Sequence, residues 1–199
     1  MFGAYRIVSF IGRGGMGEIY LAEDTRLRRR VALKFLSADF VNDSDRLRRF
    51  EQEAHNASAL NQPNILTIHE IGEQENRRYI CTEFVDGLTL RQSMVLQRFT
   101  VGEALDVAEQ VAAALTAAHA AKIIHRDIKP ANVLLDATRR PRLTDFGLAL
   151  DQQASAAGLT ETGTAVGTPA YMPPEQALGA RDAIGPRSDV YSLGALLYA

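Results

Sequence analysis

The chain has 199 residues, with 22 lysines and arginines against 24 aspartates and glutamates, which gives a formal net charge of −2. Hydrophobic residues make up 46% and charged residues 23%, a composition that is typical of a globular domain and excludes a disordered or collagen-like chain. A balance so close to neutral gives no overall attraction to nucleic acid, and we expect no such partner. The single cysteine, Cys81, excludes an internal disulfide and a cysteine-cluster metal site.

Nothing in the sequence indicates export or a membrane span. No basic region followed by an apolar run comes after Met1. No stretch approaches the roughly 18 apolar residues of a spanning helix. We therefore expect a cytoplasmic location and no membrane segment in this chain, although a longer protein could be anchored by a segment outside it. The four histidines show no metal-ligand spacing.

The first part of the chain alternates short apolar runs with turns, which predicts β-strands. Strands are expected over residues 5–11, 18–24 and 31–36, with the glycine-rich segment Gly12–Gly17 between the first two. Three strands in succession predict an antiparallel meander. The run Arg26–Arg30 could be a nucleic-acid patch, but no basic surplus elsewhere supports that reading, and a solvated hairpin turn is favoured.

Residues 42–45 offer caps for a helix that extends to about Leu60. Its apolar stripe consists of Leu47, Phe50, Ala54, Ala57 and Leu60. Glu53 lies on the same face, where a carboxylate without a cationic partner costs several kcal/mol. Lys34 lies in an apolar strand, where its positive charge likewise needs a partner of opposite charge, so we expect Lys34 and Glu53 to pair. Glu53 could instead lie at the edge of the stripe.

Two further strands, 65–71 and 79–85, are expected on either side of a polar turn over residues 72–78. The chain then becomes mainly helical. A long helix is marked by the spacing of Leu105, Ala108, Val111, Ala112, Leu115 and Ala118. Strands dominate the first half and helices the second, with a boundary near residues 85–88, which predicts an α+β fold.

The spacing Gly12-x-Gly14-x-x-Gly17 is a weak signal alone, because dinucleotide-binding proteins share it. In those proteins the glycines open a helix, whereas here a strand is expected to follow, which disfavours that alternative. A glycine loop between two strands lets backbone N–H groups approach phosphate oxygens. Lys34 could supply a point charge to the same anion. A plain flexible hairpin remains the alternative.

The segment 125–132 carries Asp127, Lys129 and Asn132 on one short loop after the long helix. These residue types suit phosphoryl transfer, because a carboxylate can accept a hydroxyl proton, a lysine can stabilise phosphate and an amide oxygen can hold a metal ion. Asp145 adds a second candidate ligand for magnesium, which prefers a few hard oxygens together with substrate phosphates.

The order of these motifs identifies a family. They are the glycine loop, VALK ending at Lys34, Glu53, HRDIKPAN at 125–132, DFG at 145–147, GTPAYMPPE at 167–175 and SDVYSLG at 188–194. The chain resembles Hanks-type serine/threonine protein kinases, especially bacterial ones. The resemblance implies a two-lobe kinase fold, with an antiparallel-sheet N-lobe over 5–85 that binds ATP and a mainly helical, incomplete C-lobe over 86–199.

The resemblance also implies which residues bind ATP. They are Ile11, Gly12, Arg13, Gly14, Gly15, Met16, Gly17, Glu18, Ile19, Ala32, Lys34, Thr82, Glu83, Val85 and Leu134. Among them, Ile11, Ile19, Ala32 and Leu134 would enclose adenine. Thr82 would be the gatekeeper, Glu83–Val85 the hinge, and Lys34 the ligand of the α- and β-phosphates.

The catalytic set that the resemblance implies consists of Lys34, Glu53, Asp127, Lys129 and Asn132. Asp127 would be the catalytic base and Lys129 would contact the γ-phosphate. Asn132 and Asp145 would hold Mg²⁺.

A regulatory loop is implied as well. Arg126, beside Asp127, is typical of kinases that are switched by phosphorylation of the activation loop, where an added phosphate can pair with the arginine. Thr160 and Thr162 best match the family's autophosphorylation positions, and Thr164 is the next candidate. The alternative is that these threonines only give the loop its polarity.

We therefore expect a kinase that uses Mg-ATP to phosphorylate serine and threonine hydroxyls of proteins, and that self-associates for autophosphorylation in trans. Pro173 departs from the family pattern, which usually has alanine or serine there. The family also has helices beyond Ala199, one with an arginine for the glutamate matching Glu175. Without them we expect a truncated, unstable chain with an uncovered last helix. The alternative function is a non-catalytic nucleotide-binding or interaction module.

Overall fold

The computed structural model describes residues 1–14, 17–146 and 169–199. The chain divides into two compact units. The first consists of residues 1–59 and 66–84, and the second of residues 60–65 and 85–199. Each unit has its own sheet. No described helix has the length and apolar character needed to cross a membrane.

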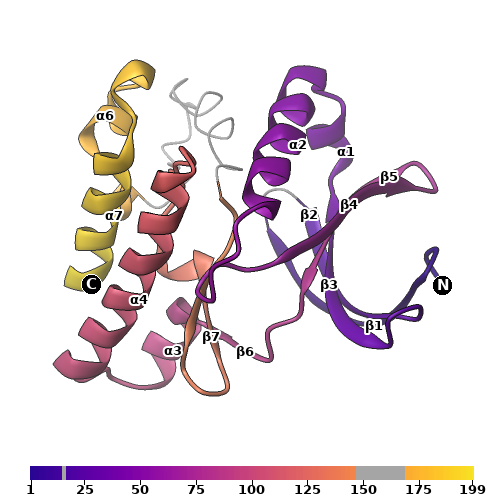
Figure 1. The fold of residues 1–199 in the computed structure, drawn as a ribbon, viewed down its shortest axis with the longest axis horizontal. Coiled ribbons are helices and arrows are strands. Elements are labelled where there is room, and N and C mark those ends of the chain that lie inside the picture. The colour runs from indigo at the N-terminus through magenta and orange to yellow at the C-terminus, as the bar shows by residue number, and fades with distance from the viewer. Residues whose placement is uncertain (15–16, 147–168) are drawn as a thin grey trace, which may run out of the picture. The chain divides into compact units, whose positions relative to one another are not determined.

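The first unit is built on an antiparallel five-stranded sheet with the strand order β1-β2-β3-β5-β4 (Figure 1). Its strands are β1 (Tyr5–Gly14), β2 (Gly17–Asp24), β3 (Arg29–Leu36), β4 (Ile68–Gln74) and β5 (Arg77–Glu83). The predicted meander of the first three strands is confirmed. The arginine run lies in the turn from β2 to β3 and at the start of β3.

The connection from β4 to β5 is shorter than the sequence suggested. Only Glu75 and Asn76 lie between the strands, and their φ angles are 52° and 56°. Two consecutive left-handed residues match the twist of the flanking strands in a tight hairpin. The prediction of a polar turn over 72–78 is therefore wrong at both ends, because the polar residues on either side of Glu75 and Asn76 are paired with each other in the strands.

The start of β4 is also different from the prediction. The strand begins at Ile68, whereas Ile65 belongs to the second unit and makes an isolated parallel bridge with Leu143. An apolar residue ahead of a strand cannot be distinguished by periodicity from the strand itself.

One face of the five-stranded sheet carries a buried cluster of side chains. Its members are Phe2, Tyr5, Ala22, Val31, Leu33, Phe35, Tyr79 and Cys81. Phe2 packs edge-on against Phe35, with 4.9 Å between the ring centroids, a contact worth about 0.5–1.5 kcal/mol beyond its buried area. The hydroxyl groups of Tyr5 and Tyr79 both donate a hydrogen bond to Glu70, so both hydroxyl groups are satisfied. Burial raises the pKa of Tyr79 to about 12.

Two helices belong to the first unit, α1 (Ala38–Val41) and α2 (Ser44–Ser58). The short α1 was not predicted. The apolar stripe of α2 is confirmed at Phe50, Ala54 and Ala57, which are buried. The helix packs against β4 (Figure 1) and Phe50 meets Phe40 of α1 with 5.2 Å between the ring centroids.

The second unit contains most of the helices and a small antiparallel sheet with the order β6-β7-β8. Its elements are β6 (Gly87–Thr89), α3 (Leu90–Leu96), α4 (Val101–Ala120), β7 (Val133–Asp136), β8 (Pro141–Leu143), α6 (Pro174–Ala177) and α7 (Pro186–Tyr198). Short 3₁₀ turns lie at Pro130–Asn132, Pro169–Tyr171 and Arg181–Ala183. The long helix α4 confirms the prediction and begins with a capping box formed by Thr100 and Glu103.

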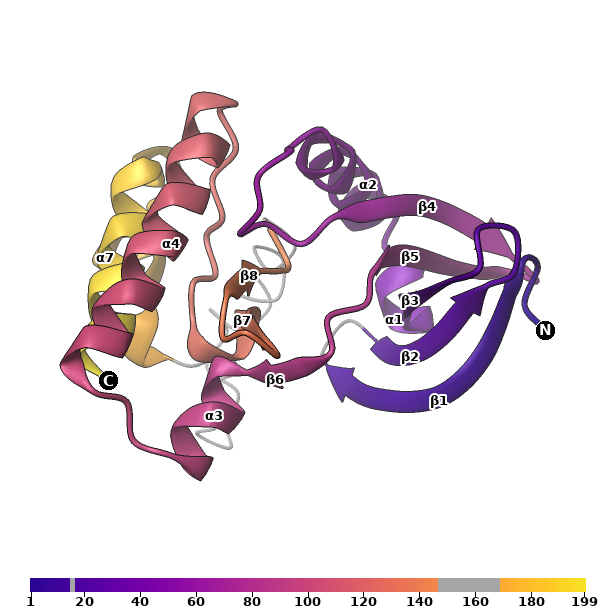
Figure 2. The same ribbon diagram turned by 60° about the horizontal axis from the view of Figure 1, so that its bottom comes forward.

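The helix α7 lies beside α4 (Figure 2). The sequence predicts an uncovered last helix, and part of the surface of α7 is exposed. Its buried residues are Ser188, Asp189, Ser192 and Leu196, whereas Val190, Tyr191, Leu197 and Tyr198 are exposed. Three of the four buried side chains are polar, so this face serves hydrogen bonding more than apolar packing.

Candidate active site

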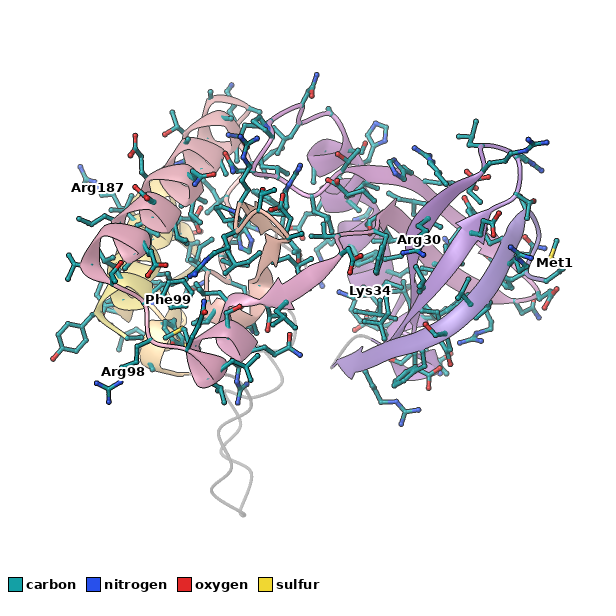
Figure 3. The ribbon with its side chains drawn as sticks, turned by 90° about the horizontal axis from the view of Figure 1, so that it is seen from below. Met1, Arg30, Lys34, Arg98, Phe99 and Arg187 are labelled. Atoms are coloured by element: carbon teal, nitrogen blue, oxygen red, sulfur yellow. The ribbon has the colours of Figure 1, made fainter. Side chains whose placement is uncertain are left out.

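The register of the first sheet brings four predicted ATP-binding residues onto one face. Ile19 lies opposite Lys34, and Ala32 lies opposite Thr82. Lys34, which is labelled in Figure 3, lies on β3. Ala32 precedes it by two residues on the same strand, so both side chains point to the face that the aromatic cluster does not occupy. All four are only partly buried, which leaves this face accessible.

The glycines of the first hairpin fall into two groups. Gly17 has a φ of 145°, and a Cβ there would lie 1.8 Å from the backbone oxygen of Phe35. Gly17 is therefore required by the fold itself. At Gly12 and Gly14 a Cβ would meet nothing within 4 Å, so those two positions leave open space for a ligand.

Two charged residues of the predicted ATP-binding set hold the same hairpin together. Arg13 and Glu18 are partners in the strand register and form an ion pair. The hydrogen bond from Arg13, with another from Tyr20, lowers the pKa of Glu18. The pair spans the base of the glycine turn, so these side chains support the turn in addition to any contact with nucleotide.

The end of β5 is tied down by two hydrogen bonds. The backbone N–H of Glu83 donates to the carbonyl oxygen of Thr67 at 2.9 Å, and the N–H of Thr67 donates to the Glu83 carboxylate at 2.8 Å. The hydroxyl of Thr82 donates to the Glu83 carbonyl oxygen at 3.1 Å. Thr82 and Glu83 lie just before the end of the first unit at Phe84, and Val85 is the first residue of the longer segment of the second unit.

Lys34 and Glu53 are both half-buried, on β3 and α2 of the first unit. Lys34 sits between apolar neighbours on its strand, and Glu53 follows the buried Phe50 on the stripe of α2. Their pairing stays a prediction.

In the second unit, three predicted catalytic residues converge. The ammonium nitrogen of Lys129 lies 2.7 Å from Oδ2 of Asp127. The side-chain nitrogen of Asn132 donates to the same Oδ2 and to the Asp127 carbonyl oxygen, both at 2.8 Å. These contacts fix the Asp127 carboxylate in one orientation, because a cation and an amide hold the same oxygen.

Asn132 and Asp145 are brought together by the backbone. The N–H of Thr144 donates to the carbonyl oxygen of Asn132 at 3.0 Å, which sets Asp145 one residue from that contact. Asn132 uses its amide nitrogen on Asp127, and its amide oxygen is the atom suited to a cation. Leu134 follows on β7.

This donor set fits magnesium. One carboxylate and one amide oxygen are the hard ligands that Mg²⁺ accepts when substrate phosphates and waters supply the rest. No cluster of three or more histidine, cysteine, aspartate or glutamate side chains occurs within residues 1–14, 17–146 and 169–199, so a site made wholly of such ligands is not found there.

Asp189 contacts the start of the loop over residues 125–132, and sequence reasoning did not single it out. It is fully buried on α7. One oxygen accepts from the N–H of Arg126 at 2.7 Å, and the other accepts from the N–H of His125 at 2.9 Å and lies 2.7 Å from Nε2 of His119. Arg126 has a φ of 68°, a left-handed conformation that costs about 1–3 kcal/mol in a residue with a side chain. Asp189 therefore holds a strained backbone directly before Asp127.

Glu175 is partnered within the second unit. Its half-buried carboxylate accepts from the hydroxyl of Ser188 at 2.5 Å, and this hydrogen bond lowers the pKa of Glu175. The sequence led us to expect no arginine for this glutamate, and the neutral hydroxyl of Ser188 on the first turn of α7 is a hydrogen-bond partner that the sequence did not indicate.

The buried His125 is neutral in this geometry. Its Nε2 donates to the Thr144 carbonyl oxygen at 2.8 Å, and its Nδ1 accepts from the N–H of Asp127 at 3.2 Å. A protonated ring would present a second N–H where an acceptor is needed. Burial lowers the pKa of His125, which is consistent with these bonds.

The neutral His125 predicts a loss of stability in acid. Because the folded state lowers its pKa, the unfolded chain binds this proton first, at a pH near 6.5. The free energy of unfolding should be fully retained above that pH and should fall below it, by up to about 1.4 kcal/mol per pH unit. Urea unfolding at pH 7.5 and 5.5 measures this loss.

The variant His125→Gln should lose less free energy on acidification than the unchanged chain. His55→Asn, at an exposed position on α2, is the control and should behave like the unchanged chain. Equal acid losses in the His125→Gln and unchanged chains would contradict the assignment of a neutral ring.

Four predicted site residues lie outside the described part of the chain. They are Gly15 and Met16 of the glycine loop and the two phosphorylation candidates, Thr160 and Thr162. Their assignments stay predictions.

The fold and the second-unit site together define the class. A five-stranded antiparallel sheet with one long helix, a mainly helical unit, and a loop with the Asp127, Lys129 and Asn132 arrangement are the parts of a protein kinase. The chain belongs to the protein kinase domain family, whose model matches residues 5–199. The predicted family is thereby confirmed.

Individual relatives are bacterial kinases. The chain is 42% identical over 197 residues to serine/threonine-protein kinase PrkC of Bacillus subtilis, and 43% identical over 199 residues to serine/threonine-protein kinase PknB of Mycobacterium tuberculosis. Each alignment covers 98% of this chain but only 30% and 32% of the relatives, so the chain spans about a third of their length.

A solved structure supports the fold directly. The kinase domain of Mycobacterium tuberculosis PknI is similar with a TM-score of 0.79 and 33% sequence identity. The match covers 99% of this chain and 73% of that one. The predicted kinase fold is confirmed.

Proposed function

We propose that this protein is a serine/threonine protein kinase that transfers the γ-phosphate of Mg-ATP to hydroxyl groups of proteins. The observation that carries the proposal is the fixed carboxylate of Asp127, held by Lys129 at 2.7 Å and by the side chain of Asn132 at 2.8 Å. The relatives named serine/threonine-protein kinases support the same class of reaction.

The roles follow from what each atom can do. The carboxylate of Asp127 accepts the proton of the attacking hydroxyl, and the contacts of that carboxylate keep it in one orientation for the transfer. Lys129 offers positive charge beside the base, where the transferring phosphate gathers negative charge. Asn132 and Asp145 would hold the metal ion, which when bound neutralises charge on the phosphates.

In the first unit, the open space at Gly12 and Gly14 gives phosphate oxygens access to backbone N–H groups. Lys34, on the accessible face with Ile19 and Ala32, would bind phosphate while the apolar side chains contact adenine. Lys34 and Glu53 would act as a pair, since a partnered lysine is held in one position.

Regulation by autophosphorylation is part of the proposal. Thr160 and Thr162 would accept phosphate from a second copy in trans, and the new charge would pair with Arg126. Arg126 is already held in place through its backbone by Asp189, so its position beside Asp127 supports a link between the modified loop and the base.

Intact mass measured after incubation with Mg-ATP tests the proposal. We expect a gain of one or more phosphates, abolished by a chelator of divalent cations and absent in the Asp127→Asn variant. Fragment mapping then assigns the phosphates to Thr160, Thr162 or other hydroxyls. ATP binding without any mass gain would instead favour a non-catalytic nucleotide-binding module.

A further inference from the structure

Gln176 connects α6 to the loop that carries the catalytic base. Its side-chain nitrogen donates to the backbone carbonyl oxygen of Arg126 at 2.8 Å, across 50 residues of sequence. Gln176 is only partly exposed, so this bond is partly shielded from competing water.

The bonded carbonyl belongs to the peptide group that links Arg126 to Asp127. The other end of the same peptide, the N–H of Asp127, donates to Nδ1 of His125 at 3.2 Å. A peptide group is planar, so bonds at both ends fix its orientation. The rotation of this plane sets where the Asp127 side chain leaves the backbone.

The peptide needs such support because the residue before it is strained. Arg126 has a φ of 68°, and relaxation toward an ordinary backbone conformation would turn its carbonyl away. Asp189 holds the N–H of Arg126 at 2.7 Å and Gln176 holds its carbonyl. Two side chains from two helices therefore secure the strained residue on both sides.

The contacts close a ring. Ser188 and Asp189 are neighbours on the first turn of α7, and Glu175 and Gln176 are neighbours on α6. Ser188 bonds to Glu175, Asp189 bonds to Arg126, and Gln176 bonds to Arg126. A displacement of α6 therefore pulls on the backbone before Asp127.

We propose that Gln176 is a positioning residue for Asp127, and that its side-chain amide makes the geometry of the catalytic loop depend on the placement of α6. This inference rests on the proposed kinase function for its activity readout. Its structural content, the restraint of residues 125–132 by Gln176, stands apart from that function.

Three variants of the full chain test the proposal. Gln176→Met has a similar shape without a donor, and Gln176→Lys retains an N–H donor. Gln52→Met is the control, because it removes an exposed glutamine of α2 whose side chain donates to Asn56 on the same helix. Loss of one neutral hydrogen bond should lower kcat about three- to tenfold in Gln176→Met. The KM for ATP should change less than kcat, because the nucleotide-binding groups of the first unit are untouched.

Amide hydrogen exchange provides the second readout. We expect faster exchange over residues 125–132 in Gln176→Met, partial recovery in Gln176→Lys and normal exchange in Gln52→Met. Exchange at the wild-type rate over 125–132 in Gln176→Met would overturn the inference, whatever the activity. If amide exchange in Gln176→Met is fast over the whole chain, the Gln176→Lys variant decides the question. Exchange over residues 125–132 that is as fast in Gln176→Lys as in Gln176→Met would then also count against the proposal.

The two proposals fail separately. If the chain without substitutions transfers no phosphate, the kinase function is refuted. The hydrogen-exchange measurement still tests whether Gln176 restrains residues 125–132. An active chain whose Gln176→Met variant keeps its kcat and its exchange refutes only the positioning role.

Discussion

Asp127→Asn should lower kcat for phosphate transfer by about 10²–10⁴-fold, the range that general-base catalysis contributes. Asparagine has nearly the same size, so Asn132 and Lys129 keep a polar neighbour, but an amide cannot accept the hydroxyl proton. Steady-state kinetics with a peptide acceptor gives kcat, and calorimetry with Mg-ATP gives affinity. Nucleotide affinity should change little, because the variant removes no group assigned to ATP.

Asp106→Asn is the matched control, since Asp106 is exposed on α4. It should retain the activity of the unchanged chain. If Asp127→Asn kept more than a tenth of the original kcat, Asp127 would not be the base. If it lost nucleotide affinity in parallel with kcat, the effect would be one of binding.

Asp189→Ala should lower the free energy of unfolding by about 3–5 kcal/mol. The substitution leaves two buried backbone N–H groups and His119 without the carboxylate that satisfies them. A whole domain is stable by only about 5–15 kcal/mol, so the variant should be unfolded or nearly so at body temperature. Chemical denaturation, followed by circular dichroism, measures the change.

Asp182→Ala, at an exposed position, should be within about 0.5 kcal/mol of the unchanged chain. Asp189→Asn should fall between the two, because an amide oxygen can still accept one of the bonds. A loss below about 1 kcal/mol in Asp189→Ala would show that the strained loop does not depend on this carboxylate.

The chemistry-bearing motifs could be predicted because local spacing determines them. Periodicity predicted the strands β2 and β3, and their register sets Ile19, Ala32 and Lys34 on one face, a grouping that only the family resemblance had implied. Asp127 and Asn132 are five residues apart, and a short loop with a 3₁₀ turn at Pro130–Asn132 is enough to bring them together.

The supporting contacts could not be predicted, because their partners are far apart in the sequence. Asp189 lies in a helix whose composition suggested apolar packing, yet its partners are His119, His125 and Arg126, which lie 63–70 residues away. Gln176 carries no motif of its own beyond its place after Glu175. Such roles depend on where the backbone leaves unpaired groups, and that is visible only in the fold.

The backbone conformations that particular residues adopt could not be predicted from the sequence either. The glycine spacing treats Gly12, Gly14 and Gly17 alike, but only Gly17 is pressed against the backbone of Phe35. Likewise, the Glu75–Asn76 turn depends on left-handed φ angles that glutamate rarely adopts, so composition pointed to a longer loop.

The thiol of Cys81 can report on the opening of the first unit. Cys81 is fully buried in the middle of β5, and burial raises its pKa to about 11. The thiolate is the reactive form, so an alkylating reagent should react only when the sheet opens. With no second cysteine in the sequence, the rate of that reaction follows the opening of one half of the chain alone. A nucleotide bound by that sheet would slow the labelling, and so its affinity could be read without following any phosphate transfer.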